Sequence, residues 1–474
     1  MNFFTFLWLL WAPLALAFQL PTKPVDDPFY EIPANVSEYE VGEIIAWRPP
    51  PVHLRSMVFP LNVKNAWQVQ VRSEDSFGEP TSVVTTIIEP YNADPSKILS
   101  YSSYVDSPSL DCSPSYAILF GASMDTLPSQ FEMTIMDIAL SKNWYVVYPD
   151  HQGPKAAFTA GLQSGRAILN AIRAALGSGE LTGIKPDAKV GLYGYSGGSI
   201  ASGWAAQIQP NYAPELKSNI VGNAFGGLMA NNTETYLTND GSPFSGLVVA
   251  MINGMMQEYP ALVPIIEQQI GKKRLKTFYE AKRMCLGATF ELYAYEELFK
   301  GSDPWMGDGN GFLEIPEIAE IMKNNTLALD EASGVPEMPL FIFQAQNDEV
   351  ISMNQAQEAY KKWCSWGAPS IEFAVSKYTA HVSEGCLGIG AGFVWLEKRL
   401  NGEKPTSGCQ MTSRDTNLLY PGADIMNIQF LDTFMRAVLG QKVGEETRNY
   451  KESTPISQLF VDVLNGIFTL LGPI

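Results

Sequence analysis

One serine in the chain stands in a setting that could make it a nucleophile. The stretch Gly194-Tyr195-Ser196-Gly197-Gly198 fits the pattern G-x-S-x-G. A β-type run (189–195) precedes it, and a helix-competent run of small residues (200–209) follows it, with Pro210 as the expected stop. A strand, a sharp turn and a helix in this order predict a nucleophile elbow, whose flanking glycines avoid clashes between strand and helix. The alternative interpretation is a glycine-rich turn without chemistry.

A serine hydroxyl needs a base, and the choice is narrow because the chain has 3 histidines. His381 follows the last expected main strand (371–376), and Asp348 follows the strand before it (339–345). The chain order Ser196, Asp348, His381 is the order of catalytic residues in α/β-hydrolases. We therefore predict that Ser196 is the nucleophile, His381 its base and Asp348 the acid that orients the base.

Other residues compete for these roles. His151 is a rival base, but it precedes the serine and would break the chain order; a buried hydrogen-bonded side chain is the alternative. Glu349 and Asp330 are rival acids, although side-chain alternation predicts that Glu349 points away from the site. The third histidine, His53, lies beside Pro49-Pro50-Pro51 and is interpreted as structural or exposed.

Acyl transfer also needs donors for the oxyanion. The Gly197 N–H, at the start of the helix after the elbow, is the first prediction. The second donor is expected from the loop after a short apolar run (116–120), which we interpret as a strand. We predict the backbone N–H of Ala122 or Ser123 there. The sequence lacks the HGGG motif that would make this assignment specific.

The elements that must position these residues alternate between strand and helix. This alternation predicts an α/β fold with a mostly parallel sheet flanked by helices. A hairpin (66–73 and 81–89) precedes it. The expected strands are 98–105, 144–148 and 219–225, and the expected helices are 131–141 and 156–176.

The alternation fails between residues 229 and 336, where helical runs occur without a clear strand. We predict a mostly helical cap at 229–336, inserted between a first core part (18–228) and a second core part (337–474). Further helices are expected at 353–366, 425–439 and 456–471, the last of them packed or interfacial and amphipathic.

Composition limits the partners of the chain. With 46% hydrophobic and 17% charged residues, the 474-residue chain can bury a large core and does not resemble a disordered protein. The net charge of −18 argues against nucleic acid and against attraction to anionic membranes. It leaves a neutral lipid or a small-molecule ester as the expected partner.

Several features predict a secreted protein. Residues 1–17 contain an apolar run and end in Ala15-Leu16-Ala17, which is typical of a cleaved signal peptide. Three N-x-S/T sequons predict glycosylation at Asn35, Asn231 and Asn324. Five cysteines in an oxidising compartment predict two disulfides and one free thiol, in a pairing that spacing does not determine. The cysteines do not show the C-x-x-C spacing that would suggest a metal site.

Several segments together resemble the fungal secretory lipase family across most of the mature chain. They are Cys112-Ser113-Pro114-Ser115-Tyr116, Asp150-His151-Gln152-Gly153, Lys155-Ala156-Ala157-Phe158, the elbow, Tyr212-Ala213-Pro214-Glu215-Leu216, Asp348-Glu349-Val350 and Ala380-His381. The resemblance implies an α/β-hydrolase core, a helical cap over the pocket, no cofactor, and a triad of Ser196, Asp348 and His381. It also implies the disulfides Cys112–Cys285 and Cys364–Cys409, with Cys386 unpaired. A lipase of this family has an aspartate in its oxyanion loop, where we place Ser123, so this chain is expected to depart from the family there.

We therefore expect a secreted carboxylic-ester hydrolase that acts on acylglycerols or related lipid esters through an acyl-enzyme on Ser196. Because family members also deacetylate fungal secondary metabolites, the resemblance leaves a short-acyl esterase as an alternative. An inactive binding protein on the same fold is a third hypothesis, which an ordered Ser, Asp and His disfavours. We expect a monomer without metal or cofactor, which could touch a lipid interface transiently through its cap.

Overall fold

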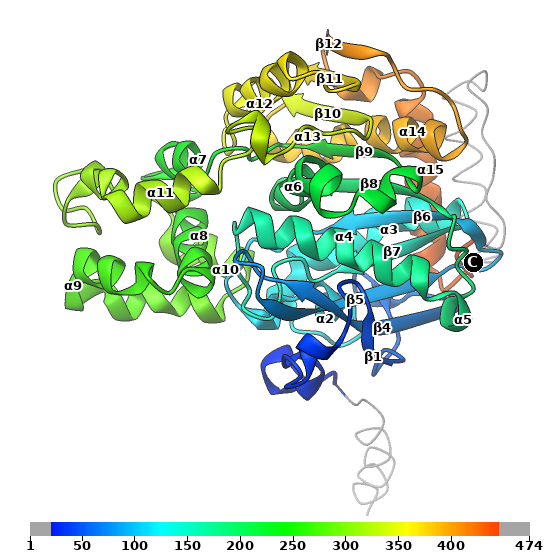
Figure 1. The fold of residues 1–474 in the computed structure, drawn as a ribbon, viewed down its shortest axis with the longest axis horizontal. Coiled ribbons are helices and arrows are strands. Elements are labelled where there is room, and N and C mark those ends of the chain that lie inside the picture. The colour runs from blue at the N-terminus through cyan, green and yellow to red at the C-terminus, as the bar shows by residue number, and fades with distance from the viewer. Residues whose placement is uncertain (1–19, 445–474) are drawn as a thin grey trace, which may run out of the picture.

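A computed structural model describes residues 20–444, with a ten-stranded sheet at its centre (Figure 1). The strands lie in the order β1-β4-β5-β7-β6-β8-β9-β10-β11-β12. Neighbours from β7 to β12 are parallel, whereas β1, β4 and β5 add an antiparallel extension at one edge. The prediction of an α/β fold with a mostly parallel sheet is confirmed, and so is the hairpin. The strands are Ile44–Arg48 (β1), Asn65–Glu74 (β4), Pro80–Glu89 (β5), Asp94–Ser102 (β6), Trp144–Pro149 (β7), Lys189–Tyr195 (β8), Ile220–Gly226 (β9), Leu340–Ala345 (β10), Ser370–Ser376 (β11) and Gly408–Arg414 (β12), beside a small hairpin of Arg55–Ser56 (β2) and Phe59–Pro60 (β3).

Helices cover both faces of this sheet. The pair α4 and α6 packs against one face, and α3, α14 and α15 form a layer on the other. Strand β8 shows why two cores form: Val190 and Leu192 belong to the first, whereas Tyr193 and Tyr195 belong to the second. The core helices are Pro114–Ala117 (α2), Leu127–Ser141 (α3), Gly161–Gly177 (α4), Gly179–Thr182 (α5), Gly197–Tyr212 (α6), Met353–Ser365 (α12), His381–Leu387 (α13), Ile389–Leu400 (α14) and Ala423–Val438 (α15).

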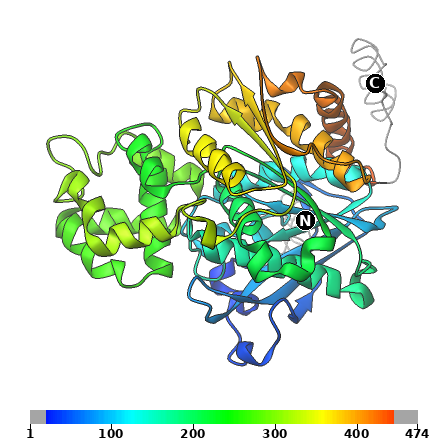
Figure 2. The same ribbon diagram turned by 45° about the horizontal axis from the view of Figure 1, so that its top comes forward.

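A group of helices without a strand lies between β9 and β10, and we call residues 229–336 the cap. Figures 1 and 2 show these helices gathered at one end of the sheet. The disulfide Cys112–Cys285 ties the cap to the core, and Cys364–Cys409 joins α12 to β12. The structure therefore contains both disulfides that the family resemblance implied. The cap helices are Asn232–Asn239 (α7), Ser245–Glu258 (α8), Leu262–Glu280 (α9), Leu286–Tyr293 (α10) and Pro316–Asn324 (α11).

Some local predictions are wrong. Residues 116–120 are not a strand, because the segment begins as the short helix α2, with Pro114 at its first position. The buried carboxylate of Asp150 holds this turn by accepting hydrogen bonds from the N–H and the hydroxyl of Ser115. The helix after the elbow does not stop at Pro210 and continues to Tyr212. The edge strands β1 and β12 were not predicted, and neither alternates cleanly between buried and exposed residues.

Two predictions fall outside the described residues, namely the signal peptide at 1–17 and the helix at 456–471. Within residues 20–444, no helix combines the length and the apolar character that crossing a bilayer requires.

Candidate active site

Ser196 occupies the sharp turn between β8 and α6, with φ of 53° and ψ of −121°. Few non-glycine residues adopt a positive φ, so this turn is strained. A Cβ atom at Gly194 would overlap the Gly198 carbonyl, and one at Gly198 would overlap the carbonyl of Ser102. These two glycines therefore allow the strand, the turn and the helix to pack closely enough to hold the serine in place.

Three side chains from three different loops meet at this turn. The Ser196 Oγ lies 2.8 Å from His381 Nε2, and His381 Nδ1 lies 2.8 Å from Asp348 Oδ2. Asp348 follows β10, whereas His381 begins α13 just after β11. Because parallel strands end at the same edge of the sheet, residues far apart in the sequence are brought within hydrogen-bond distance here.

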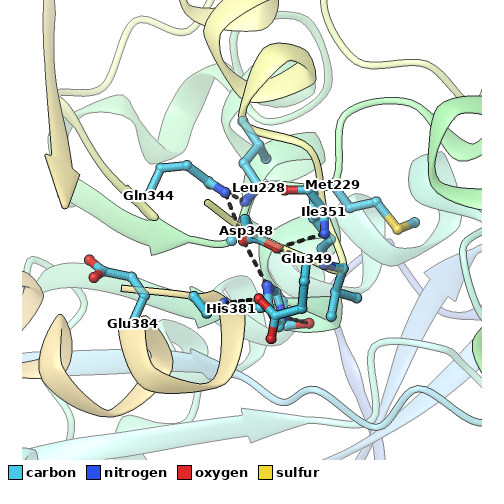
Figure 3. Close-up of polar contacts among 12 residues, drawn as sticks. Leu228, Met229, Gln344, Asp348, Glu349, Ile351, His381 and Glu384 are labelled. Atoms are coloured by element: carbon cyan, nitrogen blue, oxygen red, sulfur yellow. Dashed lines mark hydrogen bonds and ion pairs between the residues drawn. The ribbon is translucent and has the colours of Figure 1, made fainter. Parts of the chain in front are cut away.

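The carboxylate of Asp348 is held from several sides (Figure 3). Its Oδ1 accepts hydrogen bonds from the N–H groups of Val350 at 3.0 Å and Ile351 at 2.7 Å. Its Oδ2 accepts from Gln344 Nε2 at 2.9 Å in addition to His381. The buried Gln344 is fixed in turn, because its Oε1 accepts from the Leu228 N–H at 3.0 Å. These donors hold the carboxylate in one orientation.

His381 is also held through its backbone. The Tyr195 hydroxyl donates to the His381 carbonyl at 2.6 Å, and the His381 N–H donates to Glu349 Oε2 at 2.6 Å. Glu349 therefore does not point away from the site, contrary to the prediction from alternation. Burial lowers the pKa of His381, but the charge and hydrogen bond of Asp348, helped by the charge of Glu349, raise it above its ordinary value overall.

The rival residues lie elsewhere. The buried His151 hydrogen-bonds through Nε2 to the Ser103 carbonyl at 2.8 Å, and burial lowers its pKa to about 4. Asp330 caps a short turn in the second half of the cap, where it accepts a hydrogen bond from the Ser333 N–H. Neither residue lines the pocket at Ser196.

The structure does not bring Ser123 to Ser196. The Ser123 N–H donates to the Tyr116 hydroxyl at 3.1 Å, and Ser123 is the N-cap of a 3-10 turn (Met124–Thr126) before α3. The pocket is instead lined by Tyr104 and Asp106, which follow β6, and the Asp106 carboxyl lies beside Gly197. The prediction of Ser123 as a donor relied on a strand at 116–120, which the structure does not contain, and Ser123 does not line the pocket.

Asp106 is the site residue that sequence reasoning missed. It lines the pocket, and a Cβ atom added to Gly197 would overlap its carboxyl group. Among the described residues its Oδ1 is a buried oxygen without a hydrogen-bond partner. Burial raises its pKa to about 7, although the nearby His381 lowers it somewhat. The sequence did hold a signal, because Asp106 directly follows the expected strand at 98–105, whose carboxyl end had to lie beside the elbow.

A buried polar cluster anchors the loop that carries Asp106. The Glu132 carboxyl accepts hydrogen bonds from the Ser103 hydroxyl, from the Tyr101 hydroxyl at 3.1 Å and from the Tyr104 N–H at 3.2 Å. His151 binds the Ser103 carbonyl from the other side. With the residues before Asp106 tied to buried side chains from two sides, this part of the loop has little freedom to move.

The pocket beside Ser196 has a volume of about 250 Å³ and a mostly apolar lining. The cap supplies one wall, in which the rings of Phe244 and Phe290 meet edge to face at 5.6 Å. The free thiol of Cys386 also lies in this lining, on α13. The other apolar members are Phe131, Ile135, Leu247, Leu286, Val350 and Val382.

The three sequons differ in accessibility. Asn35 and Asn324 are exposed. Asn231 is partly buried, and its side chain caps α7 by accepting a hydrogen bond from the Glu234 N–H at 3.2 Å.

A serine hydroxyl, an imidazole and a buried carboxylate joined in series form an arrangement suited to acyl transfer. On a mostly parallel sheet, with an elbow and an apolar pocket, this arrangement is that of an α/β-hydrolase. The comparisons with known proteins lead to the same class.

The sequence profile described as Secretory lipase matches residues 118–408. The chain is 41% identical to Lipase 1 of Candida albicans over 92% of this chain and 93% of that protein. It is 35% identical to Lipase A of Arthroderma benhamiae over 92% of each. The crystal structure of Candida antarctica lipase A matches with a TM-score of 0.76 at 28% identity, covering 91% of this chain and 100% of that one. The chain belongs to the secretory lipase family and is a carboxylic-ester hydrolase.

Proposed function

We propose that the protein is a secreted serine lipase, which hydrolyses acylglycerols or related lipid esters through an acyl-enzyme on Ser196. One observation carries this proposal. A continuous chain of hydrogen bonds joins Asp348 to His381 and His381 to Ser196, and Ser196 lines an apolar pocket.

The first half of the reaction acylates the serine. With the proton of the neutral imidazole on Nδ1, where Asp348 accepts it, His381 Nε2 is free to take the proton of Ser196 Oγ. The oxygen then attacks the ester carbonyl, and a tetrahedral intermediate forms. His381 returns the proton to the leaving alcohol as the C–O bond breaks. A water molecule, deprotonated by the same imidazole, releases the acid in the second half.

The negative charge of the intermediate needs donors. The Gly197 N–H belongs to the first turn of α6, where N–H groups have no acceptor within the helix and attract negative charge. We assign the second donor to Asp106 in place of Ser123. A neutral carboxyl group can donate a hydrogen bond to an oxyanion, and the raised pKa of about 7 keeps Asp106 neutral below that pH.

The lining of the pocket supports an acyl chain as the group that enters it. Hydrocarbon gains free energy from burial against Phe244, Leu247, Leu286 and Phe290, and a mostly apolar lining offers few partners for hydroxyl groups. The similarity to lipases supports the same assignment.

The size of the pocket favours a second candidate as well, namely an esterase for short acyl groups. A volume of about 250 Å³ lies below the range of roughly 300–1,000 Å³ that is common for ligand pockets. A bulky alcohol would then remain outside this pocket, with only a short acyl group inside.

Secretion and glycosylation belong to the same proposal. Two disulfides support folding in an oxidising compartment, and the matching family is a secretory one. Exposure supports glycans on Asn35 and Asn324, whereas the cap role of Asn231 disfavours a glycan there. Sequencing the N-terminus of protein recovered from the medium tests cleavage before Phe18. A secreted chain that keeps Met1 would contradict it.

A chain-length series tests the catalytic proposal. The wild-type protein and Ser196→Ala are compared on matched esters from acetate to long acyl chains and on a triacylglycerol emulsion. We expect the wild type, but not Ser196→Ala, to hydrolyse the esters, and we expect the wild type to hydrolyse the triacylglycerol emulsion as well. Activity limited to acetate would favour the short-acyl esterase, and equal activity of both proteins would exclude Ser196 as the nucleophile.

A further inference from the structure

Three exposed apolar side chains lie in line along α3 and the turn before it, and we call them the α3 stripe: Met124, Leu127 and Phe131. Their exposed fractions are 59%, 41% and 37%, and that of Ile135, one turn further on, is 3%. The spacing places Leu127, Phe131 and Ile135 on one face of the helix. Exposure therefore falls step by step along one face, from the surface to a buried side chain.

The stripe runs directly into the pocket at Ser196. Both Phe131 and Ile135 line that pocket, so the same face of α3 is surface at one end and pocket wall at the other. Across the pocket, Val382 on α13 is both a lining residue and 64% exposed. The mouth of the pocket is thus bordered by apolar side chains on two sides. Single exposed apolar residues are ordinary, but a contiguous group at a pocket mouth marks an interaction site.

The segment that carries the stripe is well ordered by its own polar contacts. Gln130 Nε2 donates to the Ser123 carbonyl at 2.9 Å and to Thr126 Oγ1 at 2.8 Å, and Thr126 Oγ1 donates to the Ser123 carbonyl at 2.8 Å. The Tyr104 hydroxyl, from the loop before Asp106, donates to the Pro128 carbonyl at 3.1 Å. The Ser123 carbonyl and the Thr126 hydroxyl therefore find their partners within the segment, while large apolar side chains remain in water.

Charge identifies the kind of surface that this stripe fits. Residues 121–141 contain no lysine or arginine, and the whole chain carries a net charge of −18. Attraction to an anionic surface is therefore unavailable, and the contact has to be hydrophobic. A neutral lipid surface matches both conditions, and hydrocarbon chains leaving it would pass Phe131 on their way to Ser196.

We propose that the α3 stripe, together with Val382, is the surface through which the protein adsorbs to neutral lipid aggregates. This inference rests on the proposed lipase function. It moves the contact from the cap, where the sequence led us to expect it, to the first turns of α3.

The test uses two double variants that leave the pocket lining unchanged. Met124→Ser with Leu127→Ser removes the outer part of the stripe. The matched control removes two exposed apolar side chains of the cap, by Leu292→Ser with Tyr295→Asn; asparagine suits the positive φ of 64° at Tyr295. Because all four side chains are exposed, the thermal midpoints should stay within about 2 °C of the wild type.

Adsorption is measured in a Ser196→Ala background, by depletion of protein from the water phase over a neutral triacylglycerol emulsion. Hydrolysis of a soluble short-chain ester is measured in parallel with Ser196 present. The stripe variant should adsorb at least about 10-fold more weakly, since the gain from burial scales with the apolar area removed from water. Its soluble-ester activity should stay within about two-fold of the wild type, and raised salt should not weaken adsorption.

Unchanged adsorption of the stripe variant would overturn the proposal, and so would an equal loss in the cap variant. Failure of the proposed function would look different. In that case the wild-type protein would hydrolyse neither the soluble ester nor the emulsion, while adsorption in the Ser196→Ala background could still be compared among the variants.

Discussion

The pocket has two walls built on different principles. The catalytic wall consists of Ser196, His381, Asp348 and Asp106, which come from loops at the carboxyl edge of the sheet. The apolar wall consists of side chains from α3, α8 and α10 and from the segment before α8. In the catalytic wall, Ser196, His381 and Asp348 are joined by hydrogen bonds, whereas Asp106 Oδ1 has no partner among the described residues. In the apolar wall, side chains such as Phe244 and Phe290 are placed by packing alone.

Because of this difference, we expect the two walls to respond differently to amino-acid substitutions. Hydrogen bonds have strict distances and angles, so one substitution in the catalytic wall should remove a step of the reaction. Packing is additive and adjustable, so a substitution in the apolar wall should shift the preference among esters without stopping catalysis. Five predictions test this contrast, from the largest expected effect to the smallest.

Replacing the nucleophile should have the largest effect. Ser196→Ala should lower kcat by on the order of 10⁵-fold, because no acyl-enzyme can form. Stopped ester-hydrolysis assays measure the loss, and the circular dichroism spectrum checks that the fold is intact. Ser123→Ala is the matched control and should keep its activity, since Ser123 does not line the pocket. A large loss in that control would return Ser123 to the catalytic wall.

The two buried histidines should behave differently. His381→Ala removes the base and should cost about 10⁴-fold in kcat. His151→Ala removes only a hydrogen bond to the loop before Asp106, and should cost about 10-fold in kcat and about 1–3 kcal/mol of unfolding free energy. Kinetics and urea unfolding of both variants measure this contrast. The reverse order of activities would reassign the base.

Asp106→Asn should change the shape of the pH profile. Catalysis needs a neutral His381, and because the pKa of His381 is raised, the imidazole loses its proton only at a higher pH than usual. Activity should therefore fall on the acid side. Catalysis also needs Asp106 protonated, and with a pKa of about 7 this carboxyl loses its proton as the pH rises through neutrality. The wild type should therefore lose activity on both sides of a narrow optimum. Asparagine is always neutral and tolerates the φ of 47° at this position. The variant should therefore lack the alkaline fall, which in the wild type should reach about 10²-fold because the ionised carboxylate no longer donates to the oxyanion.

A profile of kcat between pH 5 and pH 9 for wild type and Asp106→Asn decides this point. An alkaline fall that persists unchanged in the variant would show that Asp106 does not donate to the oxyanion.

Filling the apolar wall should alter selectivity only. Phe290→Trp reduces the space beside Phe244, so kcat/KM for a medium-chain ester should fall by about 10-fold or more, since each methylene in a pocket is worth roughly 1–3 kcal/mol. The rate with the acetate ester should stay within about two-fold. Competition between the two esters measures the ratio directly. An equal loss on both would mean that this wall affects catalysis itself.

The smallest effect is expected at the boundary of the two walls. Glu349→Gln keeps an acceptor for the His381 N–H but removes a negative charge that raises the pKa of His381. The pKa should fall, so the acid limb of the profile should move to lower pH while kcat at its plateau changes by about two-fold or less. A shift to higher pH would contradict this sign.

The catalytic wall was largely predictable from the sequence because its signals are local or follow chain order. The elbow is a continuous strand, turn and helix. Asp348 and His381 each stand just past an apolar run, and parallel strands bring such positions to one edge. Asp106 was missed because the short apolar run at 116–120 does not reveal whether it forms a strand or a buried turn. The turn is held by the hydrogen bonds from Ser115 to the buried Asp150, which is distant in the sequence, so the apolar run by itself does not predict the turn.

By itself the sequence determined the fold class and predicted the proposed nucleophile Ser196 and the chain order of the proposed triad, because local periodicity and glycine spacing encode these features. Tertiary structure alone decided which loop faces Gly197, that Glu349 turns toward His381, and that α3 carries an exposed apolar face into the pocket. The physical reason is that burial depends on contacts between segments distant in sequence. Whether Phe131 or Ile135 meets water or substrate is therefore settled only when the cap, α3 and α13 come together.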